Sequence, residues 1–163
     1  MSNIVDINEN GDTPGNLLET TTITVRWSDM DALGHVNNAM YFRYFEITRM
    51  AWYDGLGSGA LGASKNGMVI VDAHAEFLKA VRYPSVIDVS MFGGAPGRSS
   101  FNTFYRITDH ATQELYTRGS ARIVWVDDTS EHSMPLPEQV IRQLPDGKRD
   151  RAVSARQQPR DQS

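Results

Sequence analysis

One stretch of the sequence sets the expected architecture: Arg26-Trp27-Ser28-Asp29-Met30-Asp31-Ala32-Leu33-Gly34-His35-Val36-Asn37-Asn38-Ala39-Met40-Tyr41. It places two carboxylates, an imidazole and two amides in a glycine-containing turn between a strand-like run and a long apolar helix. A helix N-terminus offers unpaired backbone N–H groups and a partial positive charge, which suit an oxyanion. Acidic and basic side chains beside it can activate water or attack a carbonyl. We therefore look for chemistry at this turn first.

The residues on either side of the turn predict a strand and a helix. Apolar and polar residues alternate over Thr22–Ser28, which favours a half-buried strand. The following residues, Asn38–Leu56, predict a helix with Asn37 or Asn38 as N-cap and a glycine, Gly55 or Gly57, as its stop. This helix is apolar over most of its circumference, so we expect it to be enclosed rather than to lie on a surface.

Four further strands and a short helix are expected after a Gly/Ser-rich loop at residues 57–67. The strands are predicted at Met68–Lys79, Ser85–Phe92, Ser99–Thr108 and Glu114–Val126, and an amphipathic helix at Leu136–Leu144. Short connections between successive strands imply antiparallel pairing. The order predicts an α+β fold in which one antiparallel sheet wraps around the long helix.

Length and composition limit the possible classes of protein. The 163 residues suit one domain, which we expect at residues 20–144, between a flexible leader (1–19) and a flexible tail (145–163). The net charge of −4 argues against nucleic acid or an anionic membrane as the main partner. The absence of cysteine excludes disulfides, thiolate zinc sites and cysteine nucleophiles. Because no signal segment or membrane-length apolar run is found, we expect a cytoplasmic location.

Three other uses of the acidic turn fit the residues poorly. A calcium loop beginning at Asp29 would need an oxygen ligand at Leu33 and a glutamate at Met40. An aspartyl-nucleophile phosphatase would need an apolar parallel strand before the Asp-x-Asp pair, whereas the preceding run alternates. Asp31 and His35 alone supply too few ligands for a metal.

Each polar residue of the turn also has an ordinary structural interpretation. Asp31 can be a turn former, Asn37 and Asn38 can be caps, and His35 can be a satisfied core histidine. Their occurrence together at a helix N-terminus favours function. Asp31 is a better reactive group than Asp29 because it lies closer to the helix, whose dipole keeps a carboxylate ionised.

Charged residues elsewhere have structural interpretations as well. Glu46 lies three residues from both Arg43 and Arg49, so an ion pair is favoured over a catalytic role. His74 shares its strand face with Asp72 and Glu76, and we interpret it as structural or interfacial.

The motif Asp29-Met30-Asp31-Ala32-Leu33-Gly34-His35-Val36-Asn37-Asn38-Ala39-Met40-Tyr41-Phe42-Arg43-Tyr44-Phe45-Glu46 resembles the signature of hotdog-fold acyl-CoA thioesterases of the 4-hydroxybenzoyl-CoA thioesterase type. The resemblance continues through Glu76–Tyr83, through the hairpin Gly97-Arg98-Ser99-Ser100, and to Trp125 in the last strand. It therefore covers about residues 20–140, with the first motif the specific part.

The resemblance implies a fold, an assembly and a set of site residues. A five- or six-stranded antiparallel sheet wraps the long helix, subunits pair through their sheets, and a homodimer associates further into a homotetramer with active sites at the interface. Asp31 is the expected catalytic carboxylate, as nucleophile or as general base. The backbone N–H of Asn38 is expected to hold the thioester oxygen, and His35 to orient water or substrate.

The same resemblance implies the reaction, hydrolysis of an acyl-CoA with a medium-chain, long-chain or aromatic acyl group. It implies no metal or redox cofactor, since coenzyme A belongs to the substrate. Phosphate binding is expected from cations and polar groups at strand ends, with Arg82, Arg98 and Ser99 as the candidates and Arg122 as a further one. Hydrolysis of acyl-carrier-protein thioesters and a non-catalytic acyl-CoA-binding module are the alternatives. The aromatic residues of the helix can line either the core or a pocket.

Overall fold

The computed structural model describes residues 15–57 and 66–146. Its elements, in order, are β1 (Asn16–Thr24), the 3-10 turn η1 (Trp27–Asp29), α1 (Asn38–Gly55), β2 (Asn66–Phe77), β3 (Val86–Gly93), β4 (Ser100–Asp109), β5 (Leu115–Asp127) and α2 (Glu138–Ile141). The long helix and the last four strands confirm the predicted elements to within one or two residues at each end.

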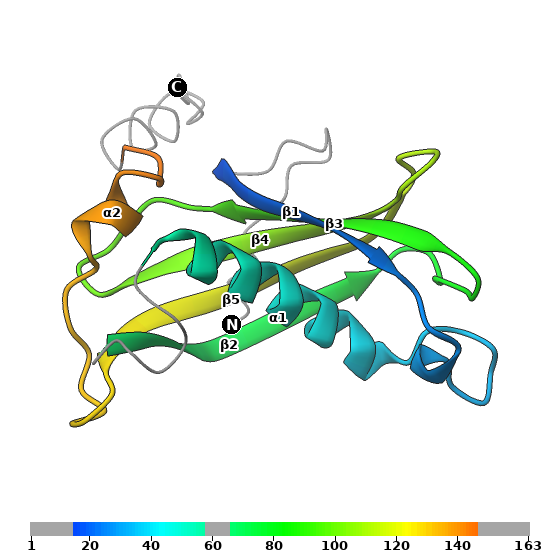
Figure 1. Ribbon diagram of the computed structural model, residues 1–163, viewed down its shortest axis with the longest axis horizontal. Coiled ribbons are helices and arrows are strands. Elements are labelled where there is room, and N and C mark those ends of the chain that lie inside the picture. The colour runs from blue at the N-terminus through cyan, green and yellow to red at the C-terminus, as the bar shows by residue number, and fades with distance from the viewer. Residues whose placement is uncertain (1–14, 58–65, 147–163) are drawn as a thin grey trace, which may run out of the picture.

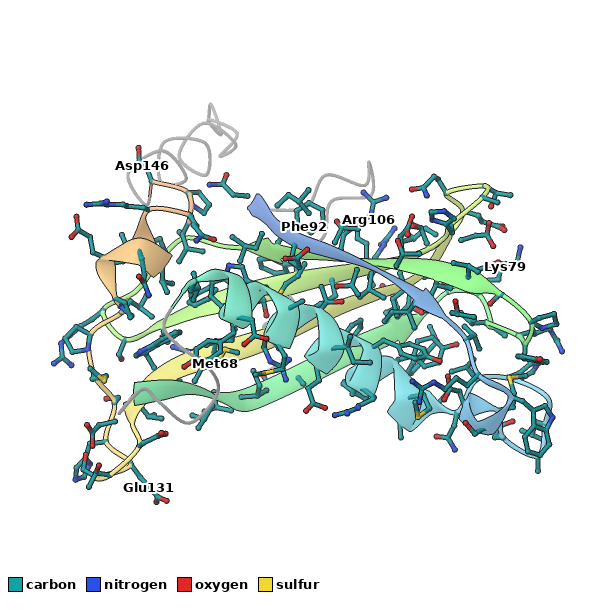
Figure 2. The ribbon with its side chains drawn as sticks, in the orientation of Figure 1. Met68, Lys79, Phe92, Arg106, Glu131 and Asp146 are labelled. Carbon is teal, nitrogen blue, oxygen red and sulfur yellow. The ribbon has the colours of Figure 1, made fainter. Side chains whose placement is uncertain are left out.

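The strands form one five-stranded sheet in the order β1-β3-β4-β5-β2, and every neighbouring pair is antiparallel. In Figure 1, α1 lies across one face of this sheet. β1 and β2 are the two edges, and Met68 and Lys79 mark the opposite ends of the β2 edge in Figure 2. One antiparallel sheet with one long helix is the predicted α+β arrangement.

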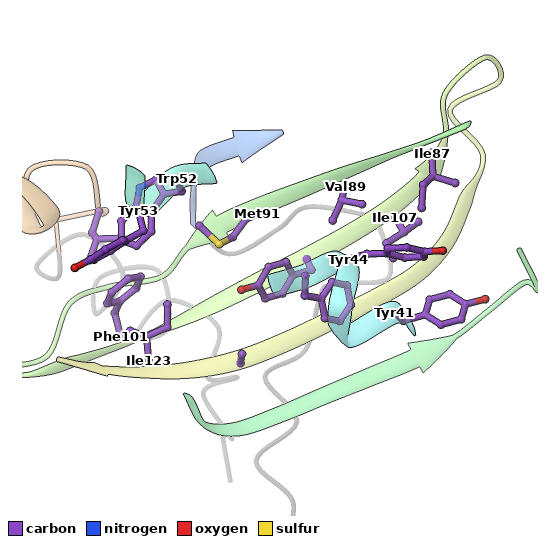
Figure 3. Packing of buried hydrophobic residues seen from close by; sticks show 14 of the residues in the cluster. Tyr41, Tyr44, Trp52, Tyr53, Ile87, Val89, Met91, Phe101, Ile107 and Ile123 are labelled. Atoms are coloured by element: carbon purple, nitrogen blue, oxygen red, sulfur yellow. The ribbon is translucent and has the colours of Figure 1, made fainter. Parts of the chain in front are cut away.

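The core lies between α1 and the sheet. The helix buries a stripe at helical spacing: Tyr41, Tyr44, Phe45, Thr48, Trp52 and Tyr53. Phe45 stacks on Tyr105 of β4, with ring centroids 4.4 Å apart, while Trp52 meets Phe101 edge-on at 5.9 Å. Figure 3 shows Tyr41 and Tyr44 at one end of this core and Trp52 and Tyr53 at the other. The aromatic pairs thus fix where the helix N-terminus lies over the sheet.

The first strand differs from the prediction at both ends. β1 begins at Asn16, so four residues assigned to the leader (1–19) belong to this strand, and three of them pair with β3 while Leu18 lies at a register shift. It ends at Thr24, whereas the predicted strand ran to Ser28. The side chain of Trp27 is 77% exposed in η1, although the alternation had placed it beside buried Val25. Residues 1–14 of the predicted leader and 147–163 of the predicted tail lie outside the described residues.

The C-terminal segment closes the end of the core away from Asp31. Only Glu138–Ile141 is helical within the predicted helix, but Leu136, Val140 and Leu144 are buried as its amphipathic spacing predicts. The indole N–H of Trp52 donates to Gln143 at 2.9 Å, which fastens the segment to α1. No helix among the described residues is long and apolar enough to cross a membrane.

Candidate active site

The turn before α1 is a tight backbone structure rather than an open loop. The Asp31 N–H donates to the carbonyl oxygen of His35 at 2.8 Å, and Met30 forms an antiparallel bridge with Val36. Gly34, with φ +76°, closes the turn by donating to the Asp31 carbonyl at 3.1 Å. A β-carbon disfavours this conformation, which explains why glycine occupies the position.

The Asp31 carboxylate is only half engaged by the protein. Its Oδ1 accepts the N–H groups of Leu33 at 2.8 Å and His35 at 3.4 Å. Its Oδ2 has no hydrogen-bond partner among the described residues. The side chain is partly exposed and lines a cleft of about 750 Å³. One carboxylate oxygen is therefore held while the other is available to substrate or water.

The N-terminus of α1, which follows the same turn, presents an unpaired backbone donor. Asn37 is the N-cap, and its Oδ1 accepts the N–H of Ala39 at 2.9 Å, while its carbonyl oxygen accepts that of Met40 at 2.8 Å. Among the described residues nothing accepts a hydrogen bond from the N–H of Asn38. This N–H, with the helix dipole behind it, is suited to a developing oxyanion.

Asp29 has a different environment from Asp31, because it is only 6% exposed. One of its oxygens, Oδ2, accepts both the Tyr44 hydroxyl at 2.8 Å and the Arg26 N–H at 2.9 Å. Burial, followed by the hydrogen bond to Asp29, raises the pKa of Tyr44, so its hydroxyl keeps its proton. Asp29 is therefore a structural support of the turn.

The second wall of the cleft comes from the loop between β2 and β3, residues 78–85. The Val36 N–H donates to the Val81 carbonyl at 2.9 Å, which joins the loop to the turn. Tyr83 then lines the Asp31 cleft, and Arg82 lies exposed beside it. Of the residues expected to bind coenzyme A phosphates, Arg82 is thus adjacent in the chain to a residue of the cleft.

The other two phosphate-binding candidates lie elsewhere in the subunit. Arg98 and Ser99 precede β4 and bond to the C-terminal segment and β5, through Leu136 and Trp125. They lie near the C-terminal end of α1, about 20 Å along the helix from Asn38 at 1.5 Å per residue. Within a single subunit they therefore do not meet Arg82, because the sheet carries the two groups to opposite ends.

A smaller cleft of about 390 Å³ opens between α1 and the inner face of β2 and β5. It begins at Ala39 in the first turn of α1 and is floored by small side chains, Ala73 and Ala121. Phe42 and the buried Phe45 line it, whereas Tyr41, Tyr44 and Trp52 belong to the core alone. Glu46, also in its wall, pairs with Arg43 at 2.6 Å, as the helical spacing favoured.

Sequence reasoning missed cleft residues that lie far from the motif in the sequence or were assigned to the sheet. Tyr83 lies some fifty positions from the motif, and nothing local in the sequence links it to Asp31. Trp27 was expected in the sheet, yet it lines the cleft. Over residues 15–57 and 66–146, no three His, Cys, Asp or Glu side chains converge as a metal ion would require.

Comparisons with known proteins give the family. Residues 25–144 match the model of the thioesterase-like superfamily. The solved PA2801 protein of Pseudomonas aeruginosa, provisionally described as a thioesterase, is 37% identical over 76% of this chain and 95% of its own, with a TM-score of 0.72. A protein of Xanthomonas campestris, provisionally described as an acyl-CoA thioesterase, is 33% identical over 72% of this chain and 98% of its own, with a TM-score of 0.64.

More distant structures share the fold. A thioesterase of Thermus thermophilus, solved with coenzyme A and zinc, is 24% identical over 78% of this chain and 97% of its own, with a TM-score of 0.68. No curated protein matches the chain. The sheet order, the long helix and the family match establish the hotdog fold, and the chain belongs to the thioesterase-like superfamily as a thioester hydrolase.

Proposed function

We propose that this protein hydrolyses the thioester of an acyl-CoA to a free acid and coenzyme A. The proposal rests on one observation, namely that a single turn leaves both an Asp31 carboxylate oxygen and the Asn38 N–H at the N-terminus of α1 without protein partners among the described residues. The relative described as an acyl-CoA thioesterase, at 33% identity, supports coenzyme A as the thiol.

The proposed reaction uses Asp31 to deliver the attacking oxygen. As general base, its Oδ2 takes a proton from water while the water oxygen bonds to the thioester carbon. The carbonyl oxygen becomes an oxyanion that the Asn38 N–H stabilises, and collapse breaks the C–S bond and releases the thiolate, which takes up a proton. As nucleophile, the Asp31 carboxylate would bond to the thioester carbon and break its C–S bond, releasing the thiolate, and water would then hydrolyse the resulting acyl anhydride to the free acid and the Asp31 carboxylate.

The remaining groups of the turn hold this geometry. The N–H groups of Leu33 and His35 fix Oδ1 of Asp31, so the free oxygen has a defined direction. The His35 side chain is partly exposed in the same turn, and we assign it to orienting water or substrate. Substrate positioning of this kind lowers the barrier by avoiding the entropy of a bimolecular encounter.

We further propose that a second copy of the chain completes the site. β2 is a long edge strand with exposed apolar side chains, among them Val69, Val71 and Phe77. An open edge of this kind is a template for pairing with another strand. If two β2 edges pair antiparallel, the Met68 end of one lies beside the Lys79 end of the other.

Such pairing would bring the phosphate-binding candidates together. The partner subunit's Arg98 and Ser99 would lie at the end of the paired sheet where Asp31 and Arg82 lie. A homodimer therefore explains how residues that are far apart in one chain can serve one substrate. Association of dimers into a tetramer stays a prediction of the family resemblance.

A thiol-release assay on purified protein tests the function. We expect turnover of a panel of acyl-CoA thioesters (short, medium, long and aromatic) with saturation kinetics, and less turnover of the same acyl groups on an acyl carrier protein. Faster hydrolysis of the carrier-bound series would replace acyl-CoA as the substrate. No thiol release from either series would contradict thioester hydrolysis here and favour a binding module.

A further inference from the structure

Two buried tyrosines of α1 each hold one wall of the Asp31 cleft. One wall is the turn that contains η1 and Asp31, and the other is the loop at residues 78–85. Tyr44 bonds to the first wall and Tyr41 to the second. The two tyrosines lie three positions apart on the helix, with ring centroids 6.3 Å apart, at the same end of the core (Figure 3).

The contact of Tyr44 reaches the turn through Asp29. Besides accepting the Tyr44 hydroxyl, Asp29 accepts the Asn37 N–H on its backbone carbonyl at 2.9 Å. Asp29 thus binds the body of the helix through its side chain and the N-cap through its backbone. Since Asp31 is two residues further on, this one residue sets the position of Asp31 relative to the Asn38 N–H.

The contact of Tyr41 reaches the opposite wall directly. Its hydroxyl oxygen accepts the N–H of Val81 at 3.2 Å, and the Val81 carbonyl accepts the Val36 N–H at 2.9 Å. Tyr41 and Val81 are 2% and 1% exposed, so these bonds are shielded from water. Tyr83, two residues after Val81, faces the cleft.

We propose that Tyr44 and Tyr41 are positioning residues with separate tasks, a proposal that rests on the proposed thioesterase function. Tyr44, through Asp29, fixes the attacking carboxylate against the oxyanion donor. Tyr41, through Val81, fixes the Tyr83 wall against which substrate binds. Neither tyrosine touches the reacting atoms.

The two roles predict different kinetic changes. In Tyr44→Phe, kcat is expected to fall by about 10- to 100-fold with KM nearly unchanged, because small displacements of a reacting group are costly. In Tyr41→Phe, KM is expected to rise by about 5-fold or more with a smaller change in kcat. A matched control is Tyr105→Phe, which removes a buried hydroxyl bonded to Thr103 and Arg49 beneath the middle of the helix.

The Tyr105→Phe control distinguishes a positioning role of the two tyrosines from a general loss of stability. All three variants are expected to lower the melting temperature, but Tyr105→Phe should keep both kinetic constants within about twofold of the native values. If kcat and KM change in all three variants in proportion to the melting temperature, the tyrosines are structural only and the proposal is wrong.

Substitution of Asp29 tests the same connection by rescue. An asparagine side chain at this position would still present an oxygen to Tyr44 and Arg26, so Asp29→Asn should retain kcat within about threefold. Asp29→Ala removes the acceptor and should lose at least as much kcat as Tyr44→Phe. Equal loss in Asp29→Asn and Asp29→Ala would show that the charge of Asp29 matters and would overturn its positioning role.

Amide hydrogen exchange measures positioning without any turnover. In Tyr44→Phe, exchange at the amides of Asp31 and Asn37 should quicken by about tenfold, with the Val81 region little changed. In Tyr41→Phe, exchange at Val36 and around Val81 should quicken instead. Unchanged exchange in both variants would reject the proposal even if the wild type is active. The expected pattern in a protein that hydrolyses no acyl-CoA would support positioning and reject only the proposed function.

Discussion

At the scale of single residues, the degree of burial distinguishes two carboxylates that lie two positions apart in the sequence. Asp29 is enclosed and engaged by Tyr44 and Arg26, whereas Asp31 lines a cleft with one oxygen free. The motif alone indicated Asp31, because dipole and turn chemistry are local. It could not indicate Tyr83 or Val81, since their approach depends on how the sheet folds back on the turn.

The surroundings of a carboxylate outside the turn predict how the stability of the fold depends on pH. Asp88 of β3 is partly buried, which raises its pKa, but hydrogen bonds from Gln113, Thr22 and His110 outweigh burial and lower the pKa overall. A carboxyl with a lowered pKa stabilises the fold above its unfolded pKa of about 4, and this contribution is lost as pH falls through its folded pKa.

We therefore expect Asp88→Asn to lower the melting temperature at pH 7 by about 3–6 °C, the equivalent of one or two hydrogen bonds to a charged group. The difference from the wild type should shrink steadily as pH falls below about 4. Thermal unfolding from pH 7 to pH 2.5 checks this expectation. A difference that stays constant over that range would show that ionisation of Asp88 contributes nothing to folding.

At the scale of elements, alternation and helical periodicity located the long helix and four strands, because these patterns report burial of one face. β1 was misplaced for a physical reason. Its first residues, Asn16–Glu19, are held by backbone pairing with β3, which composition does not report. At the other end, β1 stops at Thr24, and the Val25 N–H donates to the carbonyl oxygen of Ser85. Trp27 belongs to η1, so the alternating pattern through Trp27 extends beyond the sheet.

The packing of β5 against α1 gives a prediction of its own. A β-carbon at Gly119 would lie 2.4 Å from the ring of Phe45, which is itself stacked on Tyr105 and cannot move freely. Gly119→Ala should therefore lower the free energy of unfolding by about 1–3 kcal/mol. Gly55→Ala, at the last residue of α1 with open space around it, is the control and should be neutral or slightly stabilising. Equal stabilities in chemical denaturation would mean that α1 does not press on β5 at this point.

At the scale of the whole molecule, the proposed antiparallel pairing of two chains would account both for the open edge of β2 and for the separation of Arg82 from Arg98 and Ser99. The sequence indicated Arg98 and Ser99 as polar residues at a hairpin, but no local pattern shows at which end of the sheet that hairpin lies. The strand order decides this, because it places β3, β4 and β5 between the two edge strands.

Disruption of the edge tests this assembly. A lysine in place of Val71, which is 57% exposed on β2, is expected to oppose pairing of two edges. We expect light scattering to give a multiple of the 18.2 kDa chain mass for the wild type and the single-chain mass for Val71→Lys, with acyl-CoA turnover reduced at least tenfold. Leu17→Lys, equally exposed on β1, should change neither quantity. A monomeric wild type with full activity would refute the shared site.

The central claim is that Asp31 delivers the attack on the thioester, and the turnover of Asp31→Asn measures it directly. The amide oxygen of asparagine can still accept the Leu33 N–H, so we expect the fold and the assembly to persist while basicity and nucleophilicity are lost. The predicted result is a fall in kcat of about 10²- to 10⁴-fold at an unchanged melting temperature. Turnover within threefold of the wild type would contradict the account and remove Asp31 from the reaction.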